Sequence, residues 1–247
     1  MIVRRIGEHV RAHNWFAVAI DFAIVVVGVF IGIEVANWNQ DRQARAEERR
    51  YYVQIRDDLA DDVRTMQVAI RRSQRNDAAA ELALGALAGQ VPEDVSNGQV
   101  AVAFHRAGFL YLPLVSRGTY DELVSTGNLG LLRNRKLKDA IVEYYAAMQE
   151  LRQWDQLLRD QQKEYWGAAA GVLPRPVLQA SMADQLPQVS QATLATIVSE
   201  ARSRPRLRDL LIGMAAHQAR VRRDSQSGER RARALIQTLD QQLGTAG

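Results

Sequence analysis

The stretch WFAVAIDFAIVVVGVFIGIEVA at residues 15–36 determines how this chain is held. It is apolar apart from Asp21 and Glu34. With a rise of about 1.5 Å per residue, a helix of this length covers roughly 33 Å, enough for one bilayer crossing. Trp15 and Trp38 flank it, where indole rings prefer the membrane interface. We therefore expect a transmembrane helix with these two tryptophans as interface anchors.

A cleaved signal peptide is the main alternative to a permanent anchor. The apolar region of a signal peptide is shorter and leads to a cleavage site of small residues. Here the apolar run is followed by EVANWNQ at residues 34–40, which does not fit such a site. We therefore expect the anchor to remain uncleaved.

The apolar run contains two glycines and one acid that are relevant to contacts between membrane helices. Gly28 and Gly32 form a GxxxG pair, which lets two helix backbones approach closely. At 100° per residue, Asp21 lies on the same stripe as the glycines. We expect self-association through Gly28, Gly32 and Asp21, with Asp21 as a hydrogen-bonding group across a dimer. The alternative is that Asp21 serves an ion or proton pathway beside a multi-span membrane partner.

The anchor is expected to continue into a long stalk helix. No Gly or Pro interrupts the chain between Gly32 and Gly85. Apolar residues at spacings of three and four form a one-sided seam: Tyr52, Ile55, Leu59, Val63, Met66 and Ile70. The helix should end in the glycine-containing stretch at residues 85–92.

Further helices are expected after this stretch. Short ones are predicted at residues 99–109 and 119–125, the second with a capping box from Thr119 to Glu122 and with Gly127 as its left-handed closing residue. A long helix should run from Arg135 to the prolines at 174 and 176, followed by a polar segment through residue 191, a short helix, and a last long helix from Pro205.

The middle of that last helix has small residues at its seam positions, namely Ser225, Gly228 and Ala232. A loosened region, a close helix crossing and a break near Gly228 are all consistent with this pattern. The fold class is all-α, with an antiparallel, coiled-coil-like helical bundle outside the membrane. The expected organisation is a basic flank (1–14), transmembrane helix (15–37), stalk (38–88), bundle core (89–173), and a linker with the arginine-rich last helix of the same bundle (174–247).

Arginines are concentrated near the C-terminus. Residues 201–235 contain ten arginines against three acids. A solvated helix face is the simpler interpretation, and binding of anionic lipid or nucleic acid is the alternative. The candidate contacts are Arg220, Arg222, Arg223, Arg230, Arg231 and Arg233. Nucleic acid would require a cytoplasmic domain, so we do not expect it as a partner.

Signatures of catalysis are missing from the sequence. There is no cysteine, no GxxxxGK[ST], GxGxxG or GxSxG motif, and no metal-binding cluster around the four histidines. We therefore expect no enzymatic activity, no cofactor and no metal site. His105 is expected to be a core histidine, and the acid pairs at 57–58 and 61–62 to be solvated. The strip TYDELVSTGNLGLLRNRKL at residues 119–137 is expected to form a turn between helices, with ligand binding as the alternative.

Several motifs together resemble an uncharacterised bacterial family of small membrane-anchored proteins. They are the span ending in Asn37, Trp38 and Asn39, then YYVQIRDDLADD, and later YDELVSTGNLGLLRNRKL with an IVEYY helix. In that family the span typically starts with Gly-Glu, whereas this chain has Ile20 and Asp21. The resemblance covers roughly residues 21–145 and implies an anchor and a helical domain, but no activity.

These observations favour a single-span helical scaffold or sensor in the bacterial inner membrane, in contact with lipid and forming a homo-oligomer. Basic residues occur on both sides of the span, at Arg4, Arg5 and Arg11 before it and at Arg42, Arg45, Arg49 and Arg50 after it. Asp41, Glu47 and Glu48 are interleaved with the second group, although acids count little in the positive-inside rule. On this basis we expect the N-terminus in the cytoplasm and the C-terminal domain in the periplasm.

Overall fold

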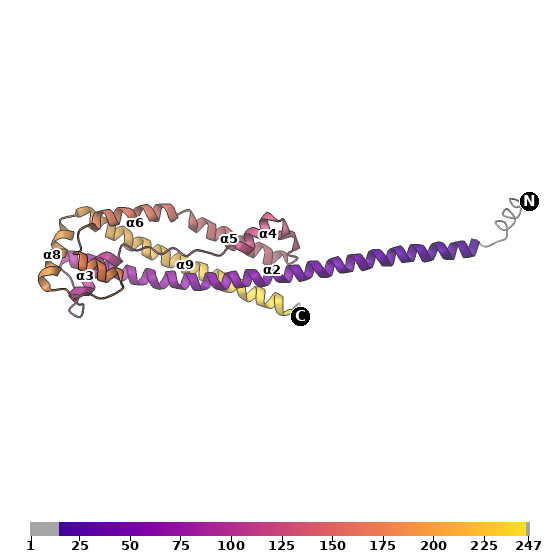
Figure 1. Ribbon diagram of the computed structural model, residues 1–247, viewed down its shortest axis with the longest axis horizontal. Coiled ribbons are helices and arrows are strands. Elements are labelled where there is room, and N and C mark those ends of the chain that lie inside the picture. The colour runs from indigo at the N-terminus through magenta and orange to yellow at the C-terminus, as the bar shows by residue number, and fades with distance from the viewer. Residues whose placement is uncertain (1–14, 246–247) are drawn as a thin grey trace, which may run out of the picture. The chain divides into compact units, whose positions relative to one another are not determined.

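The computed structural model describes residues 15–245, with the side chains of residues 20 and 22–244, and all of its regular structure is helical (Figure 1). This confirms the all-α fold class. The elements are α2 (Trp15–Ala88), α3 (Asn97–Arg106), α4 (Gly118–Ser125), the 3-10 helix η1 (Asn128–Leu131), α5 (Arg135–Arg152), α6 (Asp155–Ala169), α7 (Arg175–Met182), α8 (Gln191–Arg202) and α9 (Pro205–Thr245).

The chain divides into two compact units after Arg50. In the first unit, α2 carries an apolar surface from Phe22 to Val35 that stays exposed. This part makes α2 long and apolar enough to cross a membrane, the only such helix among the described residues. An exposed apolar surface of this size is unfavourable for a monomeric protein in water.

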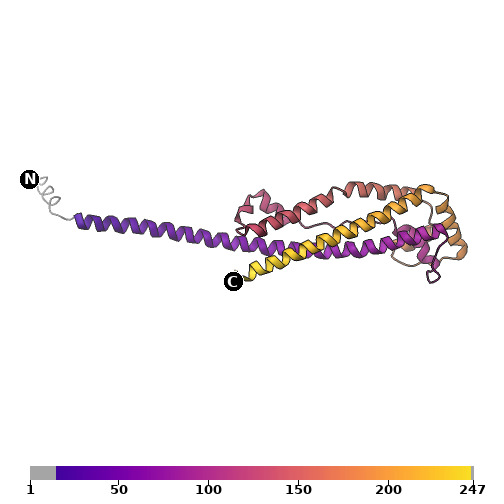
Figure 2. The ribbon, with the colours of Figure 1, turned by 180° about the vertical axis from the view of Figure 1, so that it is seen from behind.

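The second unit is a bundle in which α9 runs antiparallel to α2 and to the α5–α6 pair. In the contacts between the two helices, residue numbers rise along α2 as they fall along α9. The pairs are Arg56–Asp240, Gln67–Glu229 and Asp77–Arg222. Asn134 with Gln242 and Glu164 with Arg206 show the same order for α5–α6. Figures 1 and 2 show α9 alongside these helices from both sides of the bundle.

An extended segment at residues 109–117, called the strap here, connects α3 to α4. Its first carbonyl meets Asn76 of α2 and its Ser116 amide meets Asp62. The 14 residues of helix between Asp62 and Asn76 rise about 21 Å, while the seven steps from Phe109 to Ser116 can span at most about 25 Å. The strap must therefore be nearly fully extended, which excludes a helix there.

The bundle has two apolar cores. The tyrosine-rich core joins α2, α4, α5 and α9, and the alanine-rich core joins α2, α3, α6, α7, α8 and α9. Tyr51, Tyr52, Ile55, Leu59, Val63, Met66, Leu123, Leu132, Leu137, Ile141, Tyr144, Tyr145, Met148, Ala232, Leu235, Leu239 and Leu243 form the first. Ala79, Ala80, Ala83, Ala86, Val100, Ala101, Ala103, Phe104, Ala107, Tyr165, Val172, Val177, Leu194, Ile197, Ala201, Leu207, Leu211 and Met214 form the second.

Two parts of the chain differ from the expected arrangement of helices. The long helix after Arg135 is divided into α5 and α6 at Gln153 and Trp154, where the backbone bonds tighten to three-residue steps. The Trp154 ring lies 3.9 Å from the Arg220 guanidinium carbon of α9, a contact that sequence periodicity does not reveal. The segment expected to be only polar contains α7, which buries Val177 and Ser181 and begins after Pro174.

The expected capping box at Thr119 was wrong. Helix α4 begins after Arg117, and no side chain caps it. A capping box occurs instead at Ser96 and Gln99, at the start of α3. Gly127 does have the predicted left-handed conformation, with φ of 73°.

Helix α9 is continuous through Gly228, so the predicted alternative of a break there was wrong. A Cβ at Gly228 would lie 2.7 Å from Met66 Cε and 3.5 Å from Met148 Cε. Because glycine leaves room for both methionines, three helices approach closely at this point. The structure thus agrees with the close-crossing alternative.

Candidate functional site

The glycine pair of the apolar segment is open to a partner. No heavy atom lies within 4 Å of an ideal Cβ on Gly28 or Gly32, so both backbones are bare on this face. Trp38 is 62% exposed, and the Arg42 guanidinium carbon lies 5.8 Å from its ring centroid. The side chains of Trp15 and Asp21 lie outside the described residues. This segment offers a surface for a second helix.

Three of the six candidate arginines of α9 are engaged within the bundle. Arg222 pairs with the half-buried Asp77 of α2 at 2.6 Å. Arg220 pairs with Asp224 and lies over Trp154, and Arg233 pairs with Glu229. Arg223, Arg230 and Arg231 are exposed. The arginines therefore form no uniform basic surface, because half of them pair with acidic side chains of α9 or α2.

His105 is a buried core residue, as predicted. Its Nδ1 lies 2.7 Å from the hydroxyl of Ser181, and its ring packs against Phe109 and Trp166. Burial, assisted by the charge of Arg106, lowers the pKa of His105 and favours the neutral ring. A serine–histidine pair is the beginning of a catalytic arrangement, but aromatic rings pack against this histidine and both residues are buried. Its geometry supports packing.

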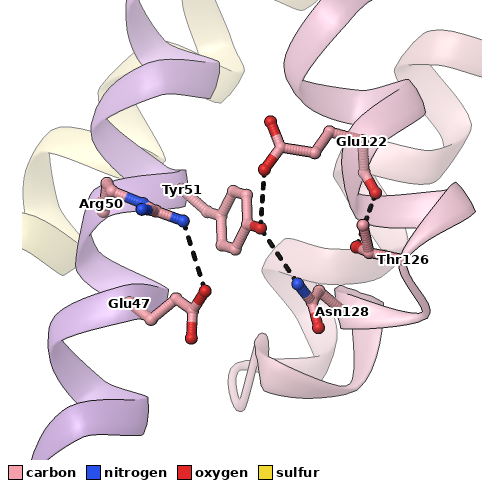
Figure 3. A network of polar contacts seen from close by, with 6 residues as sticks. All are labelled: Glu47, Arg50, Tyr51, Glu122, Thr126 and Asn128. Atoms are coloured by element: carbon pink, nitrogen blue, oxygen red, sulfur yellow. Dashed lines mark hydrogen bonds and ion pairs between the residues drawn. The ribbon is translucent and has the colours of Figure 1, made fainter.

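The strip from Thr119 to Leu137 clamps α4 and η1 onto α2. Figure 3 shows the Tyr51 hydroxyl between Glu122 and Asn128, donating to Glu122 Oε1 and accepting from Asn128 Nδ2, each at 3.0 Å. Tyr51 itself is buried in the tyrosine-rich core. The polar residues of the strip thus serve the turn and its attachment, in agreement with the simpler of the two predictions.

An acidic and aromatic cluster lies on the inner side of α2. Asp62 is 1% exposed and accepts hydrogen bonds from the Ser116 amide at 2.7 Å and from the Tyr144 hydroxyl at 2.8 Å. Burial raises the pKa of Asp62 to about 6, although both hydrogen bonds oppose this shift. Burial also raises the pKa of Tyr144, so its phenol stays protonated. The prediction that the pair at 61–62 is solvated was wrong for Asp62.

The cluster also contains polar atoms without partners. Asp58 Oδ2 and the Tyr145 hydroxyl are buried and make no hydrogen bond. Tyr145 stacks on Tyr120, with ring centroids 4.4 Å apart. The sequence showed these acids only as a charged helix face, since the helix and strap that cover them are remote along the chain.

A polar layer separates the two cores. Asn76 and Gln218, both buried, donate side-chain hydrogen bonds to the carbonyl of Phe109 at 2.9 and 2.6 Å. Gln162 donates to the neighbouring carbonyl of Gly108 at 2.9 Å. These amides satisfy carbonyls that the end of α3 leaves unpaired. The signal for this layer was present in the sequence as polar residues at seam positions of the predicted helices.

A cavity of about 40 Å³ adjoins this layer, beside the division between α5 and α6. Methionines, aliphatic side chains and Trp154 line it, together with Ser225 and four charged residues. Ser225 is 2% exposed and its hydroxyl has no hydrogen-bond partner. Among the described residues, no group of histidine and acidic side chains is arranged to hold a metal ion. Larger and more open hollows occur elsewhere on the bundle, but this smaller cavity combines mainly apolar walls with a buried serine whose hydroxyl is unpaired.

Comparison with known families supports the resemblance seen in the motifs. The model of DUF6090, a family of unknown function, matches residues 21–171. The chain belongs to DUF6090. No curated protein and no solved structure matches it. The DUF6090 region extends from Asp21 in α2 to Gly171 after α6, so α7, α8 and α9 lie beyond it. The cavity joins both parts, because Met66 and Met148 lie within the DUF6090 region and Ser225 lies on α9.

Proposed function

We propose that this DUF6090 protein is a single-span membrane protein that self-associates through the face of Gly28 and Gly32. Its helical bundle acts as a scaffold or sensor and has no catalytic activity. The observation that carries the proposal is the bare glycine face on a helix long and apolar enough to cross a membrane. Close backbone approach at small residues is a principal source of helix association in lipid.

A sensing role is supported by the construction of the bundle. Helix α2 provides both the apolar segment and a full-length element of the bundle. Its buried face carries Asp62 and Asn76, whose partners lie on the strap and on α5. A change in these partners therefore acts directly on the helix that anchors the protein.

Cross-linking in membranes tests self-association. The variants Gly28→Ile and Gly32→Ile place branched side chains on the contact face and should abolish the cross-linked dimer. Ala23→Ile is a matched control, because Ala23 lies about 140° and 180° around the helix from Gly28 and Gly32. Monomer alone in the parent protein, or equal dimer in all four proteins, would refute the proposal.

The proposed location is the bacterial inner membrane with the bundle in the periplasm. A reporter enzyme that is active only in the periplasm, fused after Gly247, should be active in intact cells. The same fusion with a reporter that is active only in the cytoplasm should be silent. The reverse pattern would place the bundle in the cytoplasm and would reopen nucleic acid as a partner of the exposed arginines.

A further inference from the structure

The cavity beside the polar layer is formed by four helices and the strap. Met66 of α2, Met148 of α5, Leu158 of α6 and Val221 of α9 provide apolar walls, and the strap closes it with residues 112, 113 and 115. Methionine side chains are flexible and adapt to differently shaped guests. On the measure used for buried water, about 40 Å³ holds roughly three or four non-hydrogen atoms.

The unpaired hydroxyl of Ser225 indicates what the cavity accepts. A serine inside a helix usually donates to the carbonyl four residues earlier, but Ser225 makes no hydrogen bond. An unpaired buried hydroxyl is unfavourable, so a guest that offers an oxygen acceptor would gain a hydrogen bond already prepared by the fold. A purely apolar guest would leave this hydroxyl unpaired.

The charges at the cavity mouth select the other end of the guest. Four charged residues line it, and three of them have ion-pair partners: Arg220 pairs with Asp224, and Asp155 pairs with Arg159. Arg152 is exposed and makes no ion pair in the described part of the chain. The mouth therefore has one positive charge left to recognise an anion.

We propose that the cavity binds a short carboxylic acid that carries a carbonyl or hydroxyl oxygen near its far end. The carboxylate lies in solvent-exposed contact with Arg152, and the far end enters between Met66 and Met148. There its oxygen accepts a hydrogen bond from Ser225. Keeping the carboxylate at the mouth avoids the large desolvation penalty of a buried charge.

The test uses two probes of nearly equal shape. In 4-oxopentanoate a carbonyl oxygen occupies the place of a methyl group in 4-methylpentanoate, and both are carboxylates. The full chain in lipid nanodiscs is labelled with 13C at its methionine methyl groups, of which there are five. Adding 4-oxopentanoate should shift the signals of Met66 and Met148 and leave Met182 and Met214 in place. For so small a ligand the expected Kd is on the order of 1 mM.

The two recognition groups are tested separately. Arg152→Gln should weaken binding of both probes, by roughly three- to tenfold. Ser225→Ala should weaken the binding of 4-oxopentanoate by roughly fivefold. The variant should then bind 4-oxopentanoate no more tightly than 4-methylpentanoate. Arg223→Gln is the matched control, because Arg223 is exposed on α9 and does not line the cavity.

Three outcomes would overturn the proposal. The first is the absence of shifts at Met66 and Met148, and the second is unchanged binding in Arg152→Gln. The third is binding of 4-methylpentanoate as tight as that of 4-oxopentanoate in the parent protein. Any one of them would leave the cavity as an ordinary packing defect beside the division of α5 and α6.

The idea that this cavity binds the ligand of a sensor rests on the proposed function. The binding experiment itself does not depend on that function. The variant Gly28→Ile/Gly32→Ile should bind 4-oxopentanoate as the parent does, since neither glycine lines the cavity. Loss of dimer without loss of binding is the expected result for this variant. If the parent protein is a monomer and binds the acid, the self-association proposal fails alone.

Discussion

The two cores of the bundle are built from side chains of very different size. In the alanine-rich core, Ala80, Ala83 and Ala101 are fully buried and let α2 and α3 lie close to their neighbours. In the tyrosine-rich core, the larger side chains of Leu59 and Tyr145 fill the space between the helices. The buried Asp62 lies beside this core. The first core has little room for added atoms, and the second loses most when atoms are removed.

The largest effect is expected from Leu59→Ala in the tyrosine-rich core. Leu59 is 0% exposed, so its truncation removes apolar contacts and leaves a cavity, with a loss of about 3 kcal/mol in the free energy of unfolding. Urea unfolding in nanodiscs, followed by near-ultraviolet circular dichroism, measures this. All seven tyrosines and two of the four tryptophans belong to the bundle unit, so most of the protein's aromatic signal comes from that unit. Leu114→Ala, at a residue 64% exposed, is the control and should change little.

The converse change, Ala83→Leu, should destabilise the alanine-rich core by about 2 kcal/mol. The added atoms have no space at a residue that is 0% exposed, and leucine's helix propensity is too close to alanine's to compensate. Ala78→Leu lies on an exposed position of the same helix and is the control. A stabilised Ala83→Leu protein would show that this core contains unfilled space and would remove the contrast between the cores.

Much of the fold could be predicted because it follows from local chemistry. The end of α2 near Gly85 and Gly89 and the left-handed turn at Gly127 depend on residues next to each other in the chain. The start of α9 at Pro205 is of the same kind. The periodic seam at Ile55 and Leu59 likewise identified core residues correctly.

The candidate site could not be predicted in the same way. Asp62 looks like its exposed neighbour Asp61 until the strap places the Ser116 amide against it, 54 residues away in sequence. Trp154, at the division between α5 and α6, likewise contacts Arg220, which lies on another helix. Gln218 is a polar residue at a seam position, but its partner, the carbonyl of Phe109, lies 109 residues away in sequence and is visible only in three dimensions.

Asp62 makes the stability of the tyrosine-rich core depend on pH. Its pKa is raised from 3.8 in the unfolded chain to about 6 in the fold, so the folded state holds a proton that the unfolded state releases. The contribution of Asp62 to stability should be largest below pH 4 and should be lost as the pH rises through 6. Between pH 4.5 and 7 this single group accounts for at most about 2 kcal/mol.

Asp62→Asn tests this dependence because asparagine keeps one acceptor for the Ser116 amide but does not ionise. The free energy of unfolding of the variant, relative to that of the parent protein, should be higher at pH 7 than at pH 4.5. The same urea experiment measures this. Asp61→Asn is the control, since Asp61 is exposed on the same helix. An Asp62→Asn effect that is equal at both pH values would show that Asp62 is ionised throughout this range.

The smallest contrast concerns how helices begin at the two cores. At α3, beside the alanine-rich core, the Ser96 hydroxyl accepts the Gln99 amide at 3.3 Å and the Gln99 side chain accepts the Ser96 amide at 2.8 Å. Ser96→Ala should therefore lower the free energy of unfolding by about 1 kcal/mol. Thr119→Ala should change it little, because α4 begins without a side-chain cap even though its sequence contains the same pattern. Equal losses in both variants, measured by urea unfolding, would mean that Thr119 does cap α4 in solution and that the sequence pattern outweighs the observed start at Arg117.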